Sequence, residues 1–207
     1  IKRTASPPAN FFNEPTTFGS RTRQSYAKTS VTHMSLRFPT VDVNSSDMPA
    51  LDILDTILGQ GQDSMLYRLL IEDHNIAYSV QVSSSTPIVT NGFFDISVEC
   101  DNNNADKVKA LIESCINTIR DKGIEEKLIK RAIKQKVSDE IFSISNADDA
   151  GMKVGQSFLY SGSKEFFDLY IKKMKAVETK DINRVLNKYF DFNTSENNGG
   201  IFKLLGF

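Results

Sequence analysis

The sequence predicts an α+β domain in which helices pack on one face of an antiparallel sheet. Strand-like alternation of apolar and polar residues occurs early in the chain and again before residue 101, and helix-like spacing dominates from residue 105 to residue 190. The resulting order of strand, helix pair, two strands, helices and strand is typical of this class. With 207 residues, of which 40% are apolar and 25% charged, the chain is large enough to bury a real core.

The first segment is expected to differ from the rest. Residues 1–28 are rich in turn formers and show no sustained period, so we predict a linker or an extended arm there and a single domain over residues 29–207. From Thr32 to Phe38 apolar and polar residues alternate, which is the pattern of a half-buried strand, and Pro39 ends it.

A pair of helices joined by a glycine loop is predicted next. Asp47 offers an N-cap and Pro49 suits the first turn of a helix over residues 48–58. After the loop, Asp63 or Ser64 offers a cap for a second helix, whose apolar residues recur at helical spacing. Because the glycine loop follows a helix rather than a strand, we interpret it as a helix joint and not as a phosphate-binding loop.

Two strands and a series of helices complete the pattern. Residues 76–82 and 92–100 alternate as strands do, and the turn formers between them predict an antiparallel hairpin. The later elements are expected as helices over residues 105–122, 124–144, 152–160, 165–174 and 181–190, and as a last strand over 200–205.

Charge and hydropathy exclude some classes of function. Lys and Arg total 25 against 26 for Asp and Glu, so the net charge of -1 supplies no field that would attract nucleic acid. One predicted helix leaves a nucleic-acid module open as an alternative, although acidic residues at both of its ends favour a solvated face. Its basic residues are Lys127, Lys130, Arg131, Lys134 and Lys136. No apolar run approaches the roughly 20 residues that cross a bilayer, so no membrane span is predicted.

The chain has two cysteines and two histidines. Cys100 and Cys115 show no Cys-x-x-Cys spacing, so we expect buried thiols, with a disulfide as the alternative in an oxidising compartment. A zinc hydrolase needs three protein ligands and a carboxylate nearby, whereas His33 and His74 stand apart and belong to no such motif. We therefore predict no catalytic residue, no metal ligand and no cofactor in this chain.

One long segment carries a resemblance to a known family. The residues that carry it are Met48-Pro49-Ala50-Leu51-Asp52-Ile53-Leu54-Asp55-Thr56-Ile57-Leu58-Gly59, Gly61, Ser64, Leu66-Tyr67-Arg68, Ile71-Glu72, Asn75-Ile76-Ala77-Tyr78-Ser79-Val80, Gly92-Phe93-Phe94 and the block that begins at Gly162. This pattern resembles the second, non-zinc-binding domain of the pitrilysin, insulinase and mitochondrial-processing-peptidase superfamily. The likeness covers residues 29–190.

The resemblance implies a processing-peptidase-like metallohydrolase fold and a companion role. In this family a similar first domain holds zinc through a His-x-x-Glu-His motif and a later glutamate. Zinc is therefore expected in a partner domain, located in the same polypeptide or in a partner subunit. The resemblance implies that this domain alone is inactive and helps to form the chamber that binds the peptide substrate.

The resemblance also points to two substrate-binding residues. Many members carry an arginine and a tyrosine seven positions apart that touch the substrate. Tyr78 matches the tyrosine, but Ile71 stands at the arginine position, and Met65 stands where a second arginine is often found. Arg68, one helical turn before Ile71, is our candidate substitute, because a cation would help to hold a developing oxyanion. The alternative for Tyr78 is a strand tyrosine that packs on the core.

A scaffold subunit that kept the fold without proteolysis is the competing hypothesis. A His-x-x-Glu-His motif in a preceding segment or a partner subunit would favour the peptidase. The chain begins at Ile1 without a methionine, so we expect it to be an excerpt of a longer polypeptide. Bacterial relatives often work outside the cytoplasm, so a periplasmic or other extracytoplasmic location is favoured if the protein is bacterial.

Overall fold

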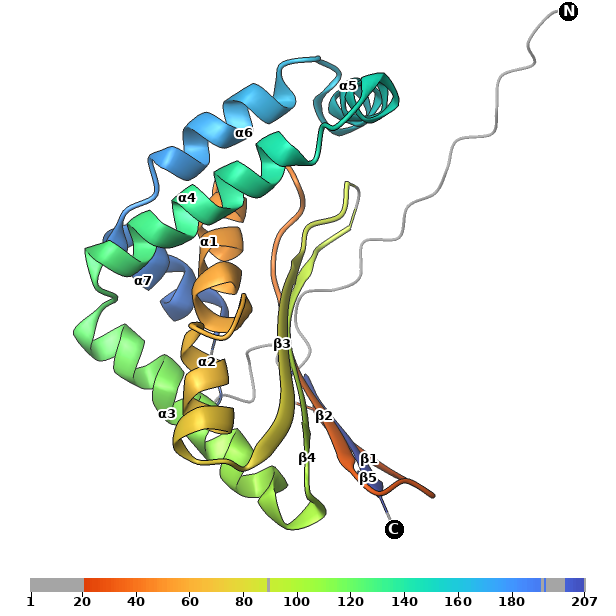
Figure 1. Ribbon diagram of the computed structural model, residues 1–207, viewed down its shortest axis with the longest axis vertical. Coiled ribbons are helices and arrows are strands. Elements are labelled where there is room, and N and C mark those ends of the chain that lie inside the picture. The colour runs from red at the N-terminus through yellow and green to blue at the C-terminus, as the bar shows by residue number, and fades with distance from the viewer. Residues whose placement is uncertain (1–20, 89, 191, 193–199, 207) are drawn as a thin grey trace, which may run out of the picture.

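The computed structural model describes residues 21–88, 90–190, 192 and 200–206. Within these residues the strands form one five-stranded sheet in the order β1-β5-β2-β4-β3. Its strands are β1 (Arg21–Ala27), β2 (Thr32–Pro39), β3 (Ala77–Ser85), β4 (Phe93–Cys100) and β5 (Gly200–Gly206). The described helices lie on one side of this sheet (Figure 1), so the predicted architecture is confirmed.

The helical elements follow the predicted order. They are α1 (Met48–Gly59), α2 (Met65–Tyr67), η1 (Arg68–Asp73), η2 (Asn102–Asn104), α3 (Ala105–Lys122), α4 (Glu126–Phe142), α5 (Ala147–Ser161), α6 (Phe166–Lys175) and α7 (Thr179–Tyr189). α1 packs against β3, and α4, α6 and α7 pack on α1. No helix in the described part of the chain is long and apolar enough to cross a membrane.

The core lies between the sheet and α1. Met34, Leu36 and Phe38 alternate along β2 and are buried, as the period-two pattern predicted. α1 is buried on every side from residue 48 to residue 58, as expected of a helix that is largely apolar and lies between a sheet and an outer helical layer. At one end, the rings of Phe38 and Phe94 both lie 4.8 Å from the ring of Phe190, which joins the end of α7 to the sheet.

The predicted hairpin is confirmed, and the sheet edge adds a feature that the sequence did not indicate. β3 and β4 pair antiparallel, with a bulge between Ala77 and Ser79. β5 pairs antiparallel with β2 and parallel with β1, so the sheet is mixed at this edge. β1 comes from residues 21–27, inside the range expected to be a linker or an extended arm. Residues 1–20 of that range lie outside the described residues.

Both predicted helix caps are wrong in their chemistry. Asp47 and Ser64 occupy the N-cap positions of α1 and α2, but neither side chain makes a capping hydrogen bond. The Asp47 carboxylate instead accepts hydrogen bonds from Arg184, Lys188 and Tyr189. At Asp47, hydrogen bonds to residues of α7 therefore take the place of the local capping bond.

The second helix of the pair also differs in its geometry. Only residues 65–67 are α-helical, and the chain continues as a π-helix to Asp73, so its turns are wider than the predicted α-helix. Asn75, with φ of 48°, takes a left-handed conformation that asparagine tolerates, and β3 begins two residues later.

The two cysteines both remain as thiols. Cys100 is buried in β4, and Cys115 is half-buried in α3. Burial raises the pKa of Cys115 to about 11, so its thiol stays protonated at neutral pH and is a poor nucleophile.

Candidate functional site

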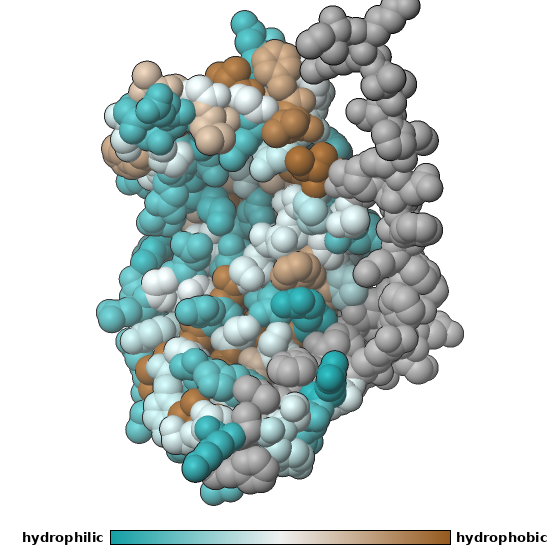
Figure 2. All heavy atoms as spheres, turned by 90° about the vertical axis from the view of Figure 1, so that its right-hand side faces the viewer, coloured by the Kyte–Doolittle hydropathy of each residue, from teal (hydrophilic) through white to brown (hydrophobic). Residues whose placement is uncertain are grey.

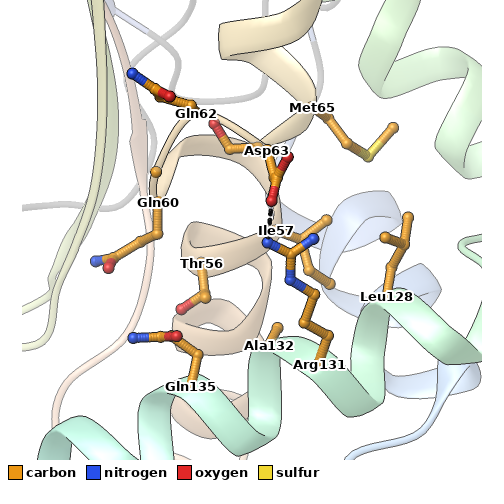
Figure 3. Close-up of a pocket in the computed structure, with 12 residues that line it drawn as sticks. Thr56, Ile57, Gln60, Gln62, Asp63, Met65, Leu128, Arg131, Ala132 and Gln135 are labelled. Atoms are coloured by element: carbon orange, nitrogen blue, oxygen red, sulfur yellow. Dashed lines mark hydrogen bonds and ion pairs between the residues drawn. The ribbon is translucent and has the colours of Figure 1, made fainter.

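A hollow of about 500 Å³ lies between the loop that joins α1 to α2 and the face of α4 (Figure 3). Residues 60–64 of the loop form one wall, and residues 128–135 of α4 form the other. The two walls are more than sixty residues apart in the sequence. A pattern within a short stretch of sequence therefore could not predict this hollow. From the sequence, the loop was interpreted only as a helix joint.

Two glycines explain the path of the loop. A Cβ added at Gly59 would lie 2.4 Å from the Cβ of Val82, so only glycine allows the end of α1 to approach β3 so closely. Gly61 has φ of 80°, a left-handed conformation that glycine adopts without steric cost. The turn that results leaves residues 60–63 exposed at the rim of the hollow.

An ion pair crosses the rim. The guanidinium Nη2 of Arg131 lies 2.5 Å from Oδ2 of Asp63, and both side chains are more than half exposed. The hydrogen bond and the charge of Arg131 lower the pKa of Asp63. Arg131 carries five N–H donors, more than one carboxylate oxygen can occupy. The rim therefore offers both an acceptor and donors to a bound molecule.

The rest of the lining mixes amides with apolar groups. In Figure 3 Gln60 and Gln135 lie on one side of the hollow with Thr56 between them, and Leu128 and Met65 lie farther along it. An amide side chain both donates and accepts hydrogen bonds, as each unit of an extended peptide backbone does. The lining thus has the chemistry to bind a peptide, and it includes no cysteine, histidine or lysine that could act as nucleophile or base.

Two buried acids lie one helical turn apart on α1. Asp52 accepts a hydrogen bond from the hydroxyl of Tyr170, and burial raises its pKa. Asp55 lies 3.3 Å from the Nζ of Lys136, and burial raises its pKa to about 6 although Lys136 opposes the shift. These contacts tie α1 to α4 and α6.

We expect Asp55→Asn to gain stability relative to the parent domain as the pH rises. The folded domain keeps the Asp55 proton up to about pH 6, whereas the unfolded chain loses it near pH 3.8. Folding therefore becomes less favourable across that window, by about 3 kcal/mol for a shift of this size, and its free energy then stays constant. Asparagine does not titrate, so urea titrations should show the difference in unfolding free energy rising from pH 4 to pH 7. The exposed Asp121→Asn is the control, and a flat difference for Asp55→Asn would contradict the expectation.

The structure gives Arg68 and Tyr78 different partners. Tyr78 is 61% exposed at the bulge in β3, and its hydroxyl donates a hydrogen bond of 2.8 Å to Asp101, which raises its pKa. Arg68 begins η1, and its Nε lies 3.8 Å from Glu72. Its charge also reaches Asp63 at the rim of the hollow. Tyr78 is thus exposed rather than packed in the core, and its hydroxyl is bound to Asp101 rather than to Arg68.

The two histidines lie on separate elements and do not fit a zinc site. His33 projects from β2 and its Nδ1 lies 3.1 Å from Glu99, while His74 is exposed after η1. Among the described residues, no group of three or more His, Cys, Asp and Glu side chains could hold a metal ion.

The basic residues of α4 are largely engaged within the domain. Lys130 lies 2.6 Å from Glu126, Arg131 pairs with Asp63, and Lys136 pairs with Asp55. Binding of a nucleic-acid phosphate backbone requires available positive charge, and these intramolecular pairs neutralise much of it. This arrangement favours the solvated, paired helix over the nucleic-acid module.

Helices on one face of a mixed five-stranded sheet, with a polar hollow beside the glycine loop, define an α+β domain. The family model described as "Peptidase M16 inactive domain" matches residues 1–136, and the chain belongs to this family. The zinc protease YmxG of Bacillus subtilis is 23% identical over 163 residues, which cover 79% of this chain and 40% of YmxG.

Solved structures share the fold. A protease from Helicobacter pylori is 17% identical with a TM-score of 0.87, over 99% of this chain and 48% of that one. The periplasmic protease PqqL of Escherichia coli is 19% identical with a TM-score of 0.75, over all of this chain and 23% of that one. The chain thus spans less than half the length of these relatives. It corresponds to the inactive domain of multi-domain zinc proteases.

Proposed function

We propose that this domain forms part of the chamber of a zinc metalloendopeptidase and contacts the peptide substrate through the hollow beside the glycine loop. The observation that carries the proposal is the lining of that hollow, where amides, an exposed ion pair and apolar side chains surround about 500 Å³. Zinc and the catalytic residues belong to the partner domain. The domain by itself is expected not to hydrolyse peptides, and the periplasmic relative favours an extracytoplasmic location.

Removing the guanidinium at the rim should weaken substrate binding. In the assembled peptidase, Arg131→Ala is expected to raise KM about tenfold with little change in kcat, because a lost charge-assisted hydrogen bond is worth about 1.5 kcal/mol. Steady-state cleavage of a fluorogenic peptide measures both constants. Arg131 and Asp63 are both exposed, so the fold should survive the change.

Lys130→Ala is the matched control, because Lys130 is the neighbouring exposed cation of α4 and pairs with Glu126 outside the hollow. It should leave KM unchanged. An unchanged KM for Arg131→Ala as well would remove the hollow from substrate binding. It would also favour the alternative of a scaffold subunit with the same fold.

Arg68 and Tyr78 remain our proposed substrate contacts near the scissile bond. Both side chains are exposed, and each could turn from its present partner toward a bound peptide. In the assembled peptidase, Arg68→Ala and Tyr78→Phe are each expected to lower kcat/KM about tenfold, since each removes one hydrogen bond to the reacting group. Glu72→Ala, which removes only the partner of Arg68, is the control. Unchanged turnover of both variants would dismiss the two residues from the site.

A further inference from the structure

α5 is the helix that this domain covers least. Of its fifteen residues, Ser157 is the buried one, and α5 packs mainly against α6. Lys153 lies on the side of α5 that faces the rest of the domain. Its Nζ lies 2.5 Å from Glu140 of α4 and 4.7 Å from the ring centre of Phe167 of α6. The residues on the side opposite Ser157 are exposed.

That outward side is apolar. We call it the α5 outer face and define it by Gly151, Met152, Val154, Gly155, Phe158 and Leu159. Its four large side chains are exposed by 48% to 70%, and Ile141, Phe142 and Ile144 extend the apolar surface along the end of α4. Figure 2 shows apolar side chains gathered at the end of the molecule where α5 lies. Monomeric domains rarely expose a contiguous patch of this kind unless a partner covers it.

The two glycines indicate how closely a partner approaches. Glycine in a helix interior costs about 1 kcal/mol relative to alanine, and a Cβ added at Gly151 or Gly155 would meet nothing within 4 Å. Nothing in the part of the domain that the structure describes therefore requires glycine at these positions. They stand one helical turn apart and leave a shallow groove between the large apolar side chains, in which the backbone of another element could pack.

We infer that the α5 outer face is the surface on which the zinc-binding half of the peptidase packs. The inference rests on the proposed function for the existence of that half. Its size is indicated by the relatives, since this chain spans 40% of YmxG and 48% of the H. pylori protease, so each carries at least as much chain again. A half that is joined or permanently assembled keeps an apolar face covered at all concentrations. A second copy of this chain would cover it only by mass action.

Hydrogen exchange of the α5 amides in the assembled peptidase tests the inference. We expect these amides to be protected, and the pair of changes Phe158→Lys and Leu159→Lys to speed their exchange at least about tenfold. Gly155→Gln should have the same effect on exchange, although glutamine is the better helix former and would by itself stabilise α5. If Gly155 only affected the stability of the helix, the glutamine variant would slow the exchange. Faster exchange would therefore indicate that Gly155 acts by packing against the partner. Tyr26→Lys, at an equally exposed aromatic residue of β1, is the control and should change nothing.

Three outcomes decide the matter. Fast exchange of α5 in the parent, unaffected by either variant, would overturn the inference while the Arg131 result could still support the hollow. Protection that grows with protein concentration would assign the face to a second copy and overturn it too. Concentration-independent protection, lost in both variants, would support it even if Arg131→Ala left KM unchanged, in which case only the peptide contact would fail.

Discussion

Replacing Gly92 by alanine is expected to lower the free energy of unfolding by about 3 kcal/mol. A Cβ at this position would lie 2.0 Å from the carbonyl oxygen of Ser85 and 2.5 Å from that of Val41. Both obstacles are backbone atoms, so no side chain can turn aside to make room. The Gly92 amide also donates to Val41, and its carbonyl accepts from Thr40, so a shift of the backbone would break these hydrogen bonds.

The matched control is Gly151→Ala in the same chain. The added Cβ meets open space there, and alanine is the better helix former, so the variant should be more stable by about 0.5–1 kcal/mol. Urea denaturation followed by circular dichroism measures both changes. If Gly92→Ala and the parent were equally stable, the expectation would be wrong. The backbone at the end of the hairpin would then be able to shift at little cost.

Replacing Asp47 by alanine is expected to cost a similar amount, about 3 kcal/mol, because the change breaks a buried charge network. The Asp47 side chain is 3% exposed and lies 2.9 Å from Nζ of Lys188 and 2.6 Å from the hydroxyl of Tyr189. Arg184 pairs with its other oxygen. These contacts hold the start of α1 to α7, and the bonded residues are at least 137 positions apart in the sequence.

The network also sets the response to acid. Burial alone would raise the pKa of Asp47, but hydrogen bonds from Tyr189 and Lys188 and the two positive charges outweigh burial and lower it. The carboxylate therefore stabilises the fold above pH 3.8 and loses this contribution as the pH falls through the lowered pKa. Asp47→Ala should accordingly show a smaller loss of stability between pH 5 and pH 2 than the parent.

Glu126→Ala is the control for an exposed ion pair. Glu126 and Lys130 are both more than two thirds exposed, so removing the carboxylate should leave the free energy of unfolding nearly unchanged. Thermal and urea unfolding of the two variants gives the comparison. A loss from Asp47→Ala as small as that from Glu126→Ala would mean that the buried network contributes little.

Most elements of this fold could be predicted, but the roles of several residues could not. The pattern Thr32, Met34, Leu36 marked a strand, and it is one, because side-chain alternation is a property of the strand itself. Asp47 looked like a local cap and is instead a tertiary ion-pair partner. The turn formers between the two hairpin strands predicted only a connecting loop, yet Gly92 is required for close approach to Ser85, and not for a positive φ.

In the candidate site, too, some residues could be found from the sequence and others could not. Tyr78 was found through a family pattern within a short stretch of chain, Arg68 was proposed as a substitute for the arginine that Ile71 replaces, and the structure places both at the surface. Arg131 and Gln135 were seen only as part of a basic helix. Their place beside the glycine loop depends on how α4 crosses α1, which no nearby residue encodes.

By itself the sequence determined the class of fold, the order of the elements and the family, because periodicity and consecutive motifs are written within short stretches of chain. Its two separated histidines also predicted that no zinc ligand set would be found in this chain. Only the tertiary structure decided which residues line the hollow, which carboxylates are buried and which helix keeps an apolar face uncovered. These properties arise from contacts between distant segments, and packing geometry sets such contacts rather than local preference.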